Sequence, residues 1–332
     1  MFRKMLRWIA ILFGLVVLYC CLALITFRWL SDQRESLTGA EAAPSTGRFV
    51  HASDVDVFIQ EAGPSDGPAV LFVHGTGAWS ETWRETLAAL GNAGFHAIAM
   101  DLPPFGYSQR PSNGDYGKLS QGKRILGVLQ SLGTDRVVLV GHSFGGGPTM
   151  EAAFLQPDRF RALVLVDVAL GITKESGPPD SNGLVQAVLK TRPLRDVLVA
   201  SFLTNPLFTR RLLGSFLADA SMATDARLRI YQQPLVVKGT TQAAGEWLPE
   251  LIAPSERTAS NNPASYAALK MPMLVLWGGK DTITPLPQGQ ELASITPGAK
   301  LVVMENVGHI PQVEDNALFN NHLLKFLAMQ TQ

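Results

Sequence analysis

The sequence Gly141-His142-Ser143-Phe144-Gly145 constrains the fold of this 332-residue chain more than any other feature. It follows an apolar run typical of a buried strand, at residues 136–140, and precedes a helical pattern at residues 147–155. A serine at such a corner is held in a strained conformation with its hydroxyl exposed, and the flanking glycines avoid Cβ clashes with neighbouring elements. An ordinary glycine-rich turn is the alternative, since the chain has 30 glycines. The order of strand, motif and helix favours Ser143 as a nucleophile.

A serine hydroxyl is a poor nucleophile until a base accepts its proton. The chain has six histidines that qualify by residue type: His51, His74, His96, His142, His309 and His322. His309 follows a strand-like run at residues 300–304 and lies in a loop, from which it can reach the carboxyl edge of a sheet. His142 adjoins Ser143, but neighbours on an extended strand point to opposite faces, which indicates a packing role. The pattern therefore predicts His309 as the base.

The base needs an acidic partner that holds its tautomer and stabilises the imidazolium. Asp281 comes directly after the strand-like run at residues 273–276, in a loop with Gly278 and Gly279, and is the predicted acid. The alternative is that Asp281 only caps a helix that starts near Pro285. Asp167 also ends a strand-like run and is the second candidate for the acid.

The tetrahedral intermediate of acyl transfer needs donors for its oxyanion. The segment His74-Gly75-Thr76-Gly77 follows an apolar run at residues 69–73, and glycines there leave backbone N–H groups free to face an anion. We expect the two donors to be the backbone N–H groups of Thr76 and Phe144. A simple strand-to-helix turn is the alternative for residues 74–77.

With Ser143, Asp281 and His309 in this chain order, residues 45–330, less a central insertion, resemble the α/β-hydrolase family. The segment at residues 101–108 resembles that family's Asp-x-Pro-Gly-x-Gly-x-Ser loop, with Pro104 in place of a glycine. The resemblance implies a mainly parallel central sheet flanked by helices, with a helical cap insertion. Epoxide hydrolases and haloalkane dehalogenases of the family carry an aspartate nucleophile, so Ser143 argues against both. Serine esterases, haloperoxidase-like esterases and carbon–carbon bond hydrolases remain open.

Apolar runs alternate with helical patterns from Arg48 onward. Continuous runs of Val, Leu and Ala predict strands that are buried on both faces, and hence a mainly parallel sheet. The predicted strands are residues 55–60, 69–73, 95–100, 136–140, 162–166, 273–276 and 301–304. The predicted helices are residues 80–90, 119–132, 147–155, 286–294 and 316–329.

The alternation lapses in the middle of the chain, and helical apolar spacing takes its place at residues 184–189, 194–203 and 208–216. We predict a helical cap over residues 171–262, inserted into a hydrolase core of residues 48–170 and 263–332. The segment has more large apolar residues than one helical face needs: Phe202, Phe208, Leu212, Leu213, Phe216 and Trp247. Some are expected to line a substrate pocket. Packing of the cap on the core is the alternative for each of them.

The stretch from Trp8 to Phe27 contains no charged residue and matches the roughly 20 residues that cross a bilayer as a helix. Residues 1–30 are therefore predicted to form a transmembrane anchor, and residues 31–47 a linker. A basic excess before the span predicts a cytoplasmic amino terminus and a non-cytoplasmic catalytic domain. A cleaved signal peptide is the alternative, although its apolar region is normally shorter. Both cysteines, Cys20 and Cys21, lie inside the span, so disulfide and thiol chemistry are not expected in the rest.

The 28 Lys and Arg residues balance 28 Asp and Glu residues, and the chain has no basic run with interleaved aromatic residues, so we expect no nucleic-acid partner. Cofactor motifs and metal motifs are not visible, and the triad chemistry requires neither. The predicted function is a membrane-anchored serine hydrolase for small to medium hydrophobic esters. A carbon–carbon hydrolase or a perhydrolase would use the same residues. A tethered interaction protein with a decayed hydrolase fold is the alternative from another class, and it would be expected to lack a triad residue. A chain that starts near Ser45 is expected to be soluble and as active as the whole.

Overall fold

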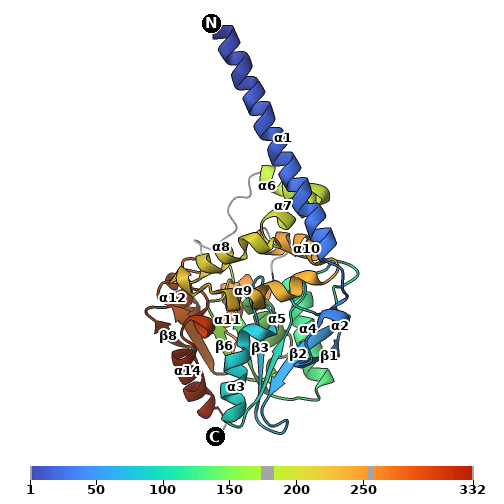
Figure 1. The fold of residues 1–332 in the computed structure, drawn as a ribbon. Helices are drawn as coiled ribbons and strands as arrows, with labels where there is room; N and C mark the ends of the chain where they lie inside the picture. The colour runs from blue at the N-terminus through green and yellow to red at the C-terminus, as the bar shows by residue number, and fades with distance from the viewer. Residues whose placement is uncertain (1, 173–182, 253–257, 331–332) are drawn as a thin grey trace.

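The computed structural model describes residues 2–172, 183–252 and 258–330, and its centre is one twisted sheet with helices on both faces (Figure 1). The described residues form eight strands in the order β1-β2-β4-β3-β5-β6-β7-β8. Strand β2 pairs antiparallel with β1 and β4, and all other neighbours are parallel. The strands are β1 (Gly47–Ala52), β2 (Val55–Ala62), β3 (Ala69–Val73), β4 (His96–Met100), β5 (Val137–His142), β6 (Phe160–Val166), β7 (Met273–Gly278) and β8 (Lys300–Met304). The predicted mainly parallel sheet is confirmed.

The central strands are apolar on both faces because each face is covered by helices. In β3, Val70 and Phe72 pack on one side of the sheet, whereas Leu71 and Val73 pack on the other. Helices α3 (Arg84–Asn92) and α14 (Asn316–Ala328) cover the first side. Helices α4 (Lys118–Ser131), α5 (Gly146–Leu155) and α12 (Leu286–Ile295) cover the second side. This two-sided burial explains why continuous apolar runs, rather than alternating ones, identified these strands.

Each predicted strand occurs, with ends that differ by at most two residues. Strand β1 was missed because only Val50 and Ala52 of its six residues are buried, so its apolar signal is weak at the edge of the sheet. The predicted helix at residues 80–90 is a 3₁₀ turn at Ser80–Trp83 followed by α3. Short helices that were not predicted are α11 (Pro263–Tyr266) and α13 (Pro311–Glu314).

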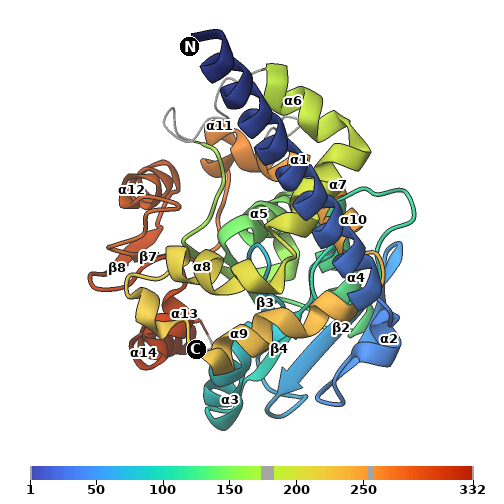
Figure 2. The ribbon, with the colours of Figure 1, turned by 45° about the horizontal axis from the view of Figure 1, so that its top comes forward.

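A helical layer lies between β6 and β7 in sequence and covers one end of the sheet (Figure 2). It consists of α6 (Gly183–Lys190), α7 (Arg192–Ser201), α8 (Pro206–Phe216), α9 (Asp225–Gln232) and α10 (Thr240–Ile252). Helices α9 and α10 were not predicted, because α9 is rich in polar residues and α10 contains Pro249. We call residues 183–252 the cap. The predicted cap at residues 171–262 also included residues 173–182 and 253–257, which lie outside the described residues.

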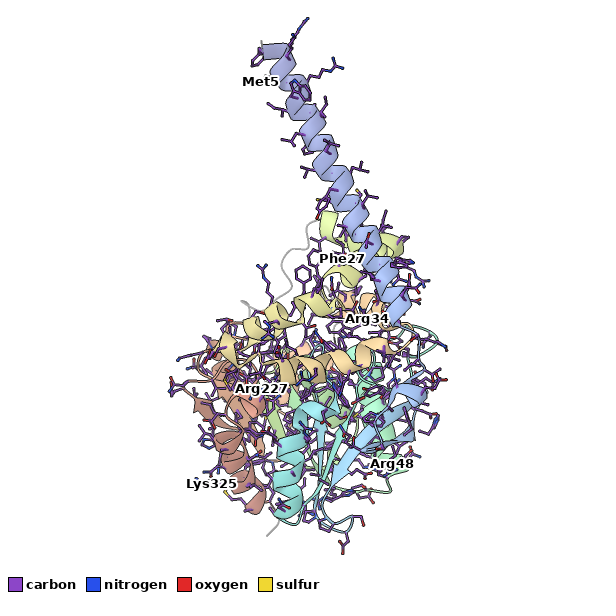
Figure 3. All side chains as sticks on the ribbon, viewed as in Figure 1. Met5, Phe27, Arg34, Arg48, Arg227 and Lys325 are labelled. Carbon is purple, nitrogen blue, oxygen red and sulfur yellow. The ribbon has the colours of Figure 1, made fainter. Side chains whose placement is uncertain are left out.

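Helix α1 (Phe2–Arg34) projects away from the body (Figure 3), and its residues 2–22 are exposed. Its most apolar window is long enough to cross a membrane and has no buried residue. The same length and composition also fit a signal sequence. The helix continues four residues past the predicted end at residue 30, and Ser31 is fully buried where α1 meets α7.

Residues of the predicted linker at 31–47 are ordered against the cap. Arg34 Nε donates to the carbonyl oxygen of Leu235 at 3.1 Å, and the Glu35 carboxylate accepts the Thr241 N–H at 3.1 Å. Leu37 pairs with Val237 through backbone hydrogen bonds that involve Val236 and Lys238. A short helix, α2 (Gly39–Ala42), follows with a capping box formed by Thr38 and Glu41. We call residues 34–43 the brace.

The brace also covers apolar side chains of the core. Ala42 and Ala43 pack against a buried cluster of Phe58, Trp79, Tyr107 and Val237. A chain cut at Ser45 would expose part of this cluster and lose the brace hydrogen bonds. The packed body therefore begins at the brace and not at Ser45.

We expect a chain starting at Ser45 to melt about 3 °C or more below a chain starting at Ser31, since losing roughly 1 kcal/mol lowers Tm by 2–4 °C in a domain this size. Thermal denaturation of the two purified chains, followed by circular dichroism, measures the difference. Both lack the apolar span, so the comparison isolates the brace. Equal melting temperatures would show that the brace contributes nothing to stability.

Candidate active site

Ser143 lies at the corner between β5 and α5, where the backbone is strained. Its φ is +52°, a left-handed conformation that costs a non-glycine residue roughly 1–3 kcal/mol. A Cβ at Gly141 would lie 2.4 Å from Thr149 Oγ1, and one at Gly145 would lie 2.4 Å from the His74 carbonyl oxygen. Glycine is therefore required at both positions for the corner to pack. The structure thus has the tight turn that the sequence pattern predicts.

Three loops at the carboxyl ends of β5, β7 and β8 bring the predicted triad residues together. Ser143 Oγ lies 2.7 Å from His309 Nε2, and His309 Nδ1 lies 2.7 Å from Asp281 Oδ2. All three side chains are buried. In the productive tautomer, the serine hydroxyl donates to Nε2 and the Nδ1 proton is donated to the carboxylate. The arrangement joins the three residues that the sequence predicts as nucleophile, base and orienting acid.

The Asp281 carboxylate accepts hydrogen bonds on both oxygens. Oδ1 accepts the N–H groups of Ile283 at 2.7 Å and Thr284 at 3.0 Å, and Oδ2 accepts the Thr284 hydroxyl at 2.6 Å. Asp281 thus accepts hydrogen bonds from the following turn and from His309 at the same time. A capping role for Asp281 is therefore compatible with its predicted role as the triad acid. Burial works to raise the pKa of Asp281, but the hydrogen bonds and charge of His309, together with Thr284, outweigh it and lower that pKa.

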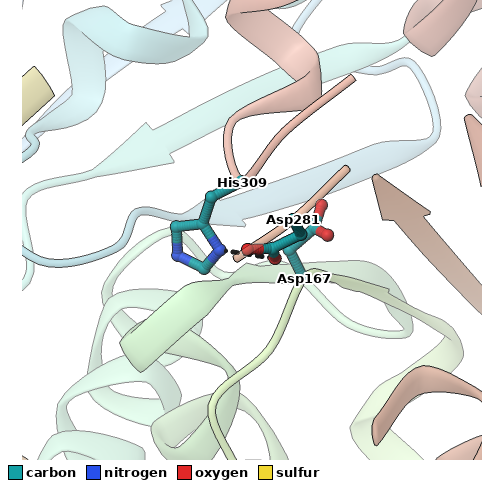
Figure 4. A group of neighbouring side chains, drawn as sticks. All are labelled: Asp167, Asp281 and His309. Atoms are coloured by element: carbon teal, nitrogen blue, oxygen red, sulfur yellow. Dashed lines mark hydrogen bonds and ion pairs between the residues drawn. The ribbon is translucent and has the colours of Figure 1, made fainter. Parts of the chain in front are cut away.

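Asp167, the second candidate for the acid, lies behind Asp281 and not on His309 (Figure 4). Its Oδ1 accepts the Gly278 N–H at 2.8 Å. Within the described residues, Asp167, Asp281 and His309 are the group whose potential metal-ligand atoms lie within 4.8 Å of one another. Both His309 nitrogens and both Asp281 oxygens already take part in hydrogen bonds, so we interpret the group as a triad with a neighbouring carboxyl rather than a metal site.

His142 does more than the predicted packing. Its Nε2–H donates to the His309 carbonyl oxygen at 2.8 Å and so holds the backbone of the base. Burial and, second, the nearby charge of His309 lower the pKa of His142 to about 3, so its ring is neutral. The N–H of His309 donates to the carbonyl oxygen of Phe216 in the cap at 2.8 Å. Sequence alone offered no signal for either contact, because both depend on tertiary structure.

The loop at residues 74–77 lies against Ser143. His74 Nδ1–H donates to the Gly75 carbonyl oxygen, and its Nε2 accepts the Leu102 N–H, each at 2.8 Å. Burial lowers the pKa of His74 to about 4, which agrees with this neutral tautomer. A Cβ at Gly75 would lie 2.7 Å from Ser143 Cβ. Thr76 follows and lines the pocket, while Phe144 follows Ser143 in the 3₁₀ turn.

The loop at residues 101–108 keeps its turn although Pro104 replaces the glycine of the family pattern. Asp101 accepts the N–H groups of Ser80 and Tyr107, each at 2.7 Å. Gly106 has a φ of +66°, and a Cβ there would overlap the Asp101 carboxylate. Burial raises the pKa of Asp101 to about 6 despite these hydrogen bonds.

A mostly apolar pocket opens between the 74–77 loop and the cap. Its apolar lining comes from the 101–108 loop and the cap: Phe105, Leu203, Leu212, Leu213, Phe216, Tyr231 and Leu235. Three of the six apolar residues singled out in the sequence therefore line it. Of the others, Trp247 is buried against Phe105 and Phe144, and Phe202 and Phe208 pack on each other.

Arg110 contributes a cation to the pocket wall and was not identified from the sequence. Its guanidinium donates to the carbonyl oxygens of Ser108 and Gly106 and, at 3.1 Å, to Thr240 Oγ1. No carboxylate within the described ranges forms an ion pair with it in this structure. Burial lowers the pKa of Arg110 to about 10, so the group remains charged at neutral pH.

Comparison with known proteins places this geometry among hydrolases. A sequence model described as the alpha/beta hydrolase fold matches residues 68–316. The 2-hydroxymuconate semialdehyde hydrolase of Pseudomonas sp. (strain CF600) is 29% identical over 301 residues, covering 88% of this chain and 97% of that protein. The solved structure of a meta-cleavage product hydrolase variant from Pseudomonas fluorescens IP01 has a TM-score of 0.70 at 25% identity, covering 86% of this chain and 98% of its own. A membrane phospholipase A has a TM-score of 0.69 at 23% identity, covering 97% of this chain and 98% of its own.

Gly75→Ala is expected to slow the reaction of Ser143 with a fluorophosphonate probe by about 100-fold, because the new Cβ displaces the serine and small misplacements carry costs of that order. The rate of covalent labelling measures the effect. Gly183→Ala is the matched control, since a Cβ there has no atom within 4 Å. Labelling of Gly75→Ala at the rate of the control would contradict the close packing of Gly75 on Ser143.

Proposed function

Because the chain belongs to the α/β-hydrolase fold family, we propose that it is a serine hydrolase that cleaves carboxylic esters of small to medium hydrophobic substrates. One observation carries the proposal: the continuous hydrogen-bonded series from Ser143 Oγ through the His309 ring to Asp281, with 2.7 Å at each step. A decayed hydrolase fold would be expected to lack one of these residues, so the intact series argues against a purely structural protein.

The first half of the reaction forms an acyl-enzyme. His309 Nε2 accepts the Ser143 hydroxyl proton while Oγ attacks the ester carbonyl carbon, and the carbonyl oxygen becomes an oxyanion. The backbone N–H groups of Thr76 and Phe144 donate to that oxyanion. The imidazolium then gives its proton to the leaving alkoxide as the carbon–oxygen bond breaks. Asp281 stabilises the imidazolium and keeps Nδ1 protonated throughout.

The second half releases the acid. His309 takes a proton from water, the hydroxide attacks the acyl carbon, and a second oxyanion forms in the same position. Collapse of this intermediate breaks the bond to Ser143 Oγ, which receives the proton back from His309. The chemistry uses groups of this chain and water alone.

The pocket supports a hydrophobic substrate. Side chains such as Leu212, Leu213 and Phe216 offer apolar contact surface, and each buried CH₂ contributes about 0.8 kcal/mol to binding at most. Phe216 also packs on the His309 ring, with 5.6 Å between ring centroids, so the apolar wall extends to the triad. An acyl chain or aromatic acyl group bound along this wall would lie close to Ser143.

Carbon–carbon bond hydrolysis is the second candidate, and two observations favour it. The relative from strain CF600 is named for 2-hydroxymuconate semialdehyde, and Arg110 provides an unpaired cation that suits a carboxylate on the substrate. The same attack of Ser143 on the carbonyl carbon of such a substrate would form an acyl-enzyme as the carbon–carbon bond breaks, with the leaving carbon, in place of an alkoxide, receiving the proton from His309. The two functions differ in substrate and share the triad.

Ser143→Ala is expected to lower kcat for ester hydrolysis by about a millionfold, since loss of the nucleophile removes nearly all catalysis by a triad. p-Nitrophenyl esters of increasing chain length are the substrates, and 2-hydroxymuconate semialdehyde is assayed in parallel. Turnover of the esters alone supports the ester proposal. Turnover of the semialdehyde alone would replace it with the second candidate. More than a few per cent of activity in the purified variant would reject Ser143 as the nucleophile.

We further propose that α1 is a retained single-pass membrane anchor with the catalytic domain on the non-cytoplasmic side. Its unburied apolar stretch supports a span, and Arg3, Lys4 and Arg7 before it support a cytoplasmic amino terminus. The brace follows the span directly, so the catalytic domain lies close to the membrane surface.

The intact chain is expected to pellet with membranes and to resist extraction by high salt or alkali, because about 20 apolar residues anchor a protein through the bilayer core. Immunodetection after fractionation measures this, and the chain starting at Ser31 is the soluble control. A soluble product that is shortened at its amino end would identify a cleaved signal peptide instead.

A further inference from the structure

Asp167 is a buried carboxyl group that the triad mechanism leaves without a role. It directly follows β6, has no exposed surface and adopts a φ of +44°, a conformation uncommon for a residue other than glycine. Its Oδ1 accepts the Gly278 N–H at 2.8 Å. Its Oδ2 is buried and has no hydrogen-bond donor among the described residues. The Asp281 carboxylate lies beside it (Figure 4), so two acceptors face one another.

The hydrogen bonds show which of the two carboxyl groups carries the negative charge. Asp281 accepts from two backbone N–H groups, the Thr284 hydroxyl and His309 Nδ1. Asp167 accepts from one backbone N–H group. Hydrogen bonds to the charged form favour ionisation, so Asp281 is the carboxylate. Two adjacent buried carboxylates would repel each other strongly, and a proton on Asp167 Oδ2 removes that repulsion.

We propose that Asp167 is protonated at neutral pH and donates a hydrogen bond from Oδ2 to the Asp281 carboxylate, which makes it a positioning residue for the triad acid. The catalytic consequence rests on the proposed function, whereas the proton itself does not. The added hydrogen bond restrains the Asp281 carboxylate on the side away from His309. It thereby fixes the direction of the bond to Nδ1 and the tautomer of the base.

The surroundings of Asp167 agree with a neutral group. The titratable groups that face it are Asp281 after β7, His309 after β8 and Glu314 of α13. Burial, followed by the charge of Asp281, holds the pKa of Asp167 well above its usual range, and Glu314 acts in the same direction. The group therefore stays protonated below its raised pKa. As the pH rises through that pKa the group ionises, and two adjacent anions would push Asp281 out of position.

The backbone around Asp167 contacts residues on both sides of the site. The Thr284 hydroxyl also lies 3.1 Å from the Asp167 carbonyl oxygen, and the N–H of Ala169 donates to the Ser143 carbonyl oxygen at 3.1 Å. The segment after β6 thus contacts both the loop after β7, which carries Asp281 and Thr284, and the turn at Ser143. A change in the Asp167 side chain is transmitted to both.

Infrared difference spectroscopy on the full chain in detergent tests whether Asp167 is protonated, and it needs no substrate. We expect a protonated-carboxyl band at pH 7 in the wild type that disappears in Asp167→Asn and persists in Asp101→Asn. The second variant is the control, because burial also raises the pKa of Asp101, to about 6, so that a minor fraction of this aspartate still holds a proton near neutral pH. An unchanged band in Asp167→Asn, or no band in the wild type, would overturn the proposal whether or not the chain hydrolyses esters.

Kinetics test the positioning role. Asparagine retains an acceptor for Gly278 and a donor for Asp281, so Asp167→Asn should keep kcat within about threefold at pH 7, whereas Asp167→Ala should lower kcat about tenfold or more at similar KM. Any fall in activity that follows ionisation of Asp167 as the pH rises should be absent from Asp167→Asn. Asp281→Asn is the reference variant for the loss of the triad acid, which lowers kcat by about 10⁴ in the best-studied triad. A loss of that size in Asp167→Asn, with unchanged circular dichroism, would overturn the proposal and identify Asp167 as the triad acid.

Discussion

The arrangement of the site depends on the His309 ring, whose two nitrogens bond Ser143 and Asp281 at 2.7 Å each. These residues come from loops after three different strands, so the ring links the loops that follow β5, β7 and β8. The backbone of His309 is held in turn by the His142 ring and by the Phe216 carbonyl oxygen. One imidazole thus receives support from the sheet below it and the cap above it. Such support keeps a base within the narrow range of positions that proton transfer requires.

Burial determines the charge state of the groups around this ring. It lowers the pKa values of His74 and His142 to about 4 and about 3, and it raises those of Asp101 and Asp167. Each of these shifts favours the neutral form, which costs least in a site of low dielectric. Asp281 is the exception, since the hydrogen bond and charge of His309, together with the Thr284 hydroxyl, outweigh the cost of burial. The negative charge is therefore concentrated where it stabilises a developing imidazolium and where few competing charges weaken it.

Much of the core could be predicted from sequence, because its signals are local. Apolar runs identified the buried strands, and the glycines around Ser143 are required by contacts within a few residues of chain or with the adjacent strand. Strand β1 and helix α9 were missed for the same reason, since each buries too few residues to leave an apolar pattern. The pairing of Asp167 with Asp281 could not be predicted. The two residues are far apart in sequence, and each by itself reads only as a carboxylate at the end of a strand.

The brace shows that the local composition of a segment does not determine where a domain begins. Its small and polar residues are typical of a linker, yet Arg34, Glu35 and Leu37 bond the cap segment from Leu235 to Thr241. Leu235 and Thr240 line the pocket, and Thr240 accepts a hydrogen bond from Arg110. Glu35 is therefore connected to Arg110 through the neighbouring residues Thr241 and Thr240. Because a buried Glu35 with a raised pKa is part of this connection, the brace has the features of a packed interior and not of a tether. The pocket wall and the end of α1 therefore form one structural unit, and the pocket cannot be described without the segment that follows the apolar helix.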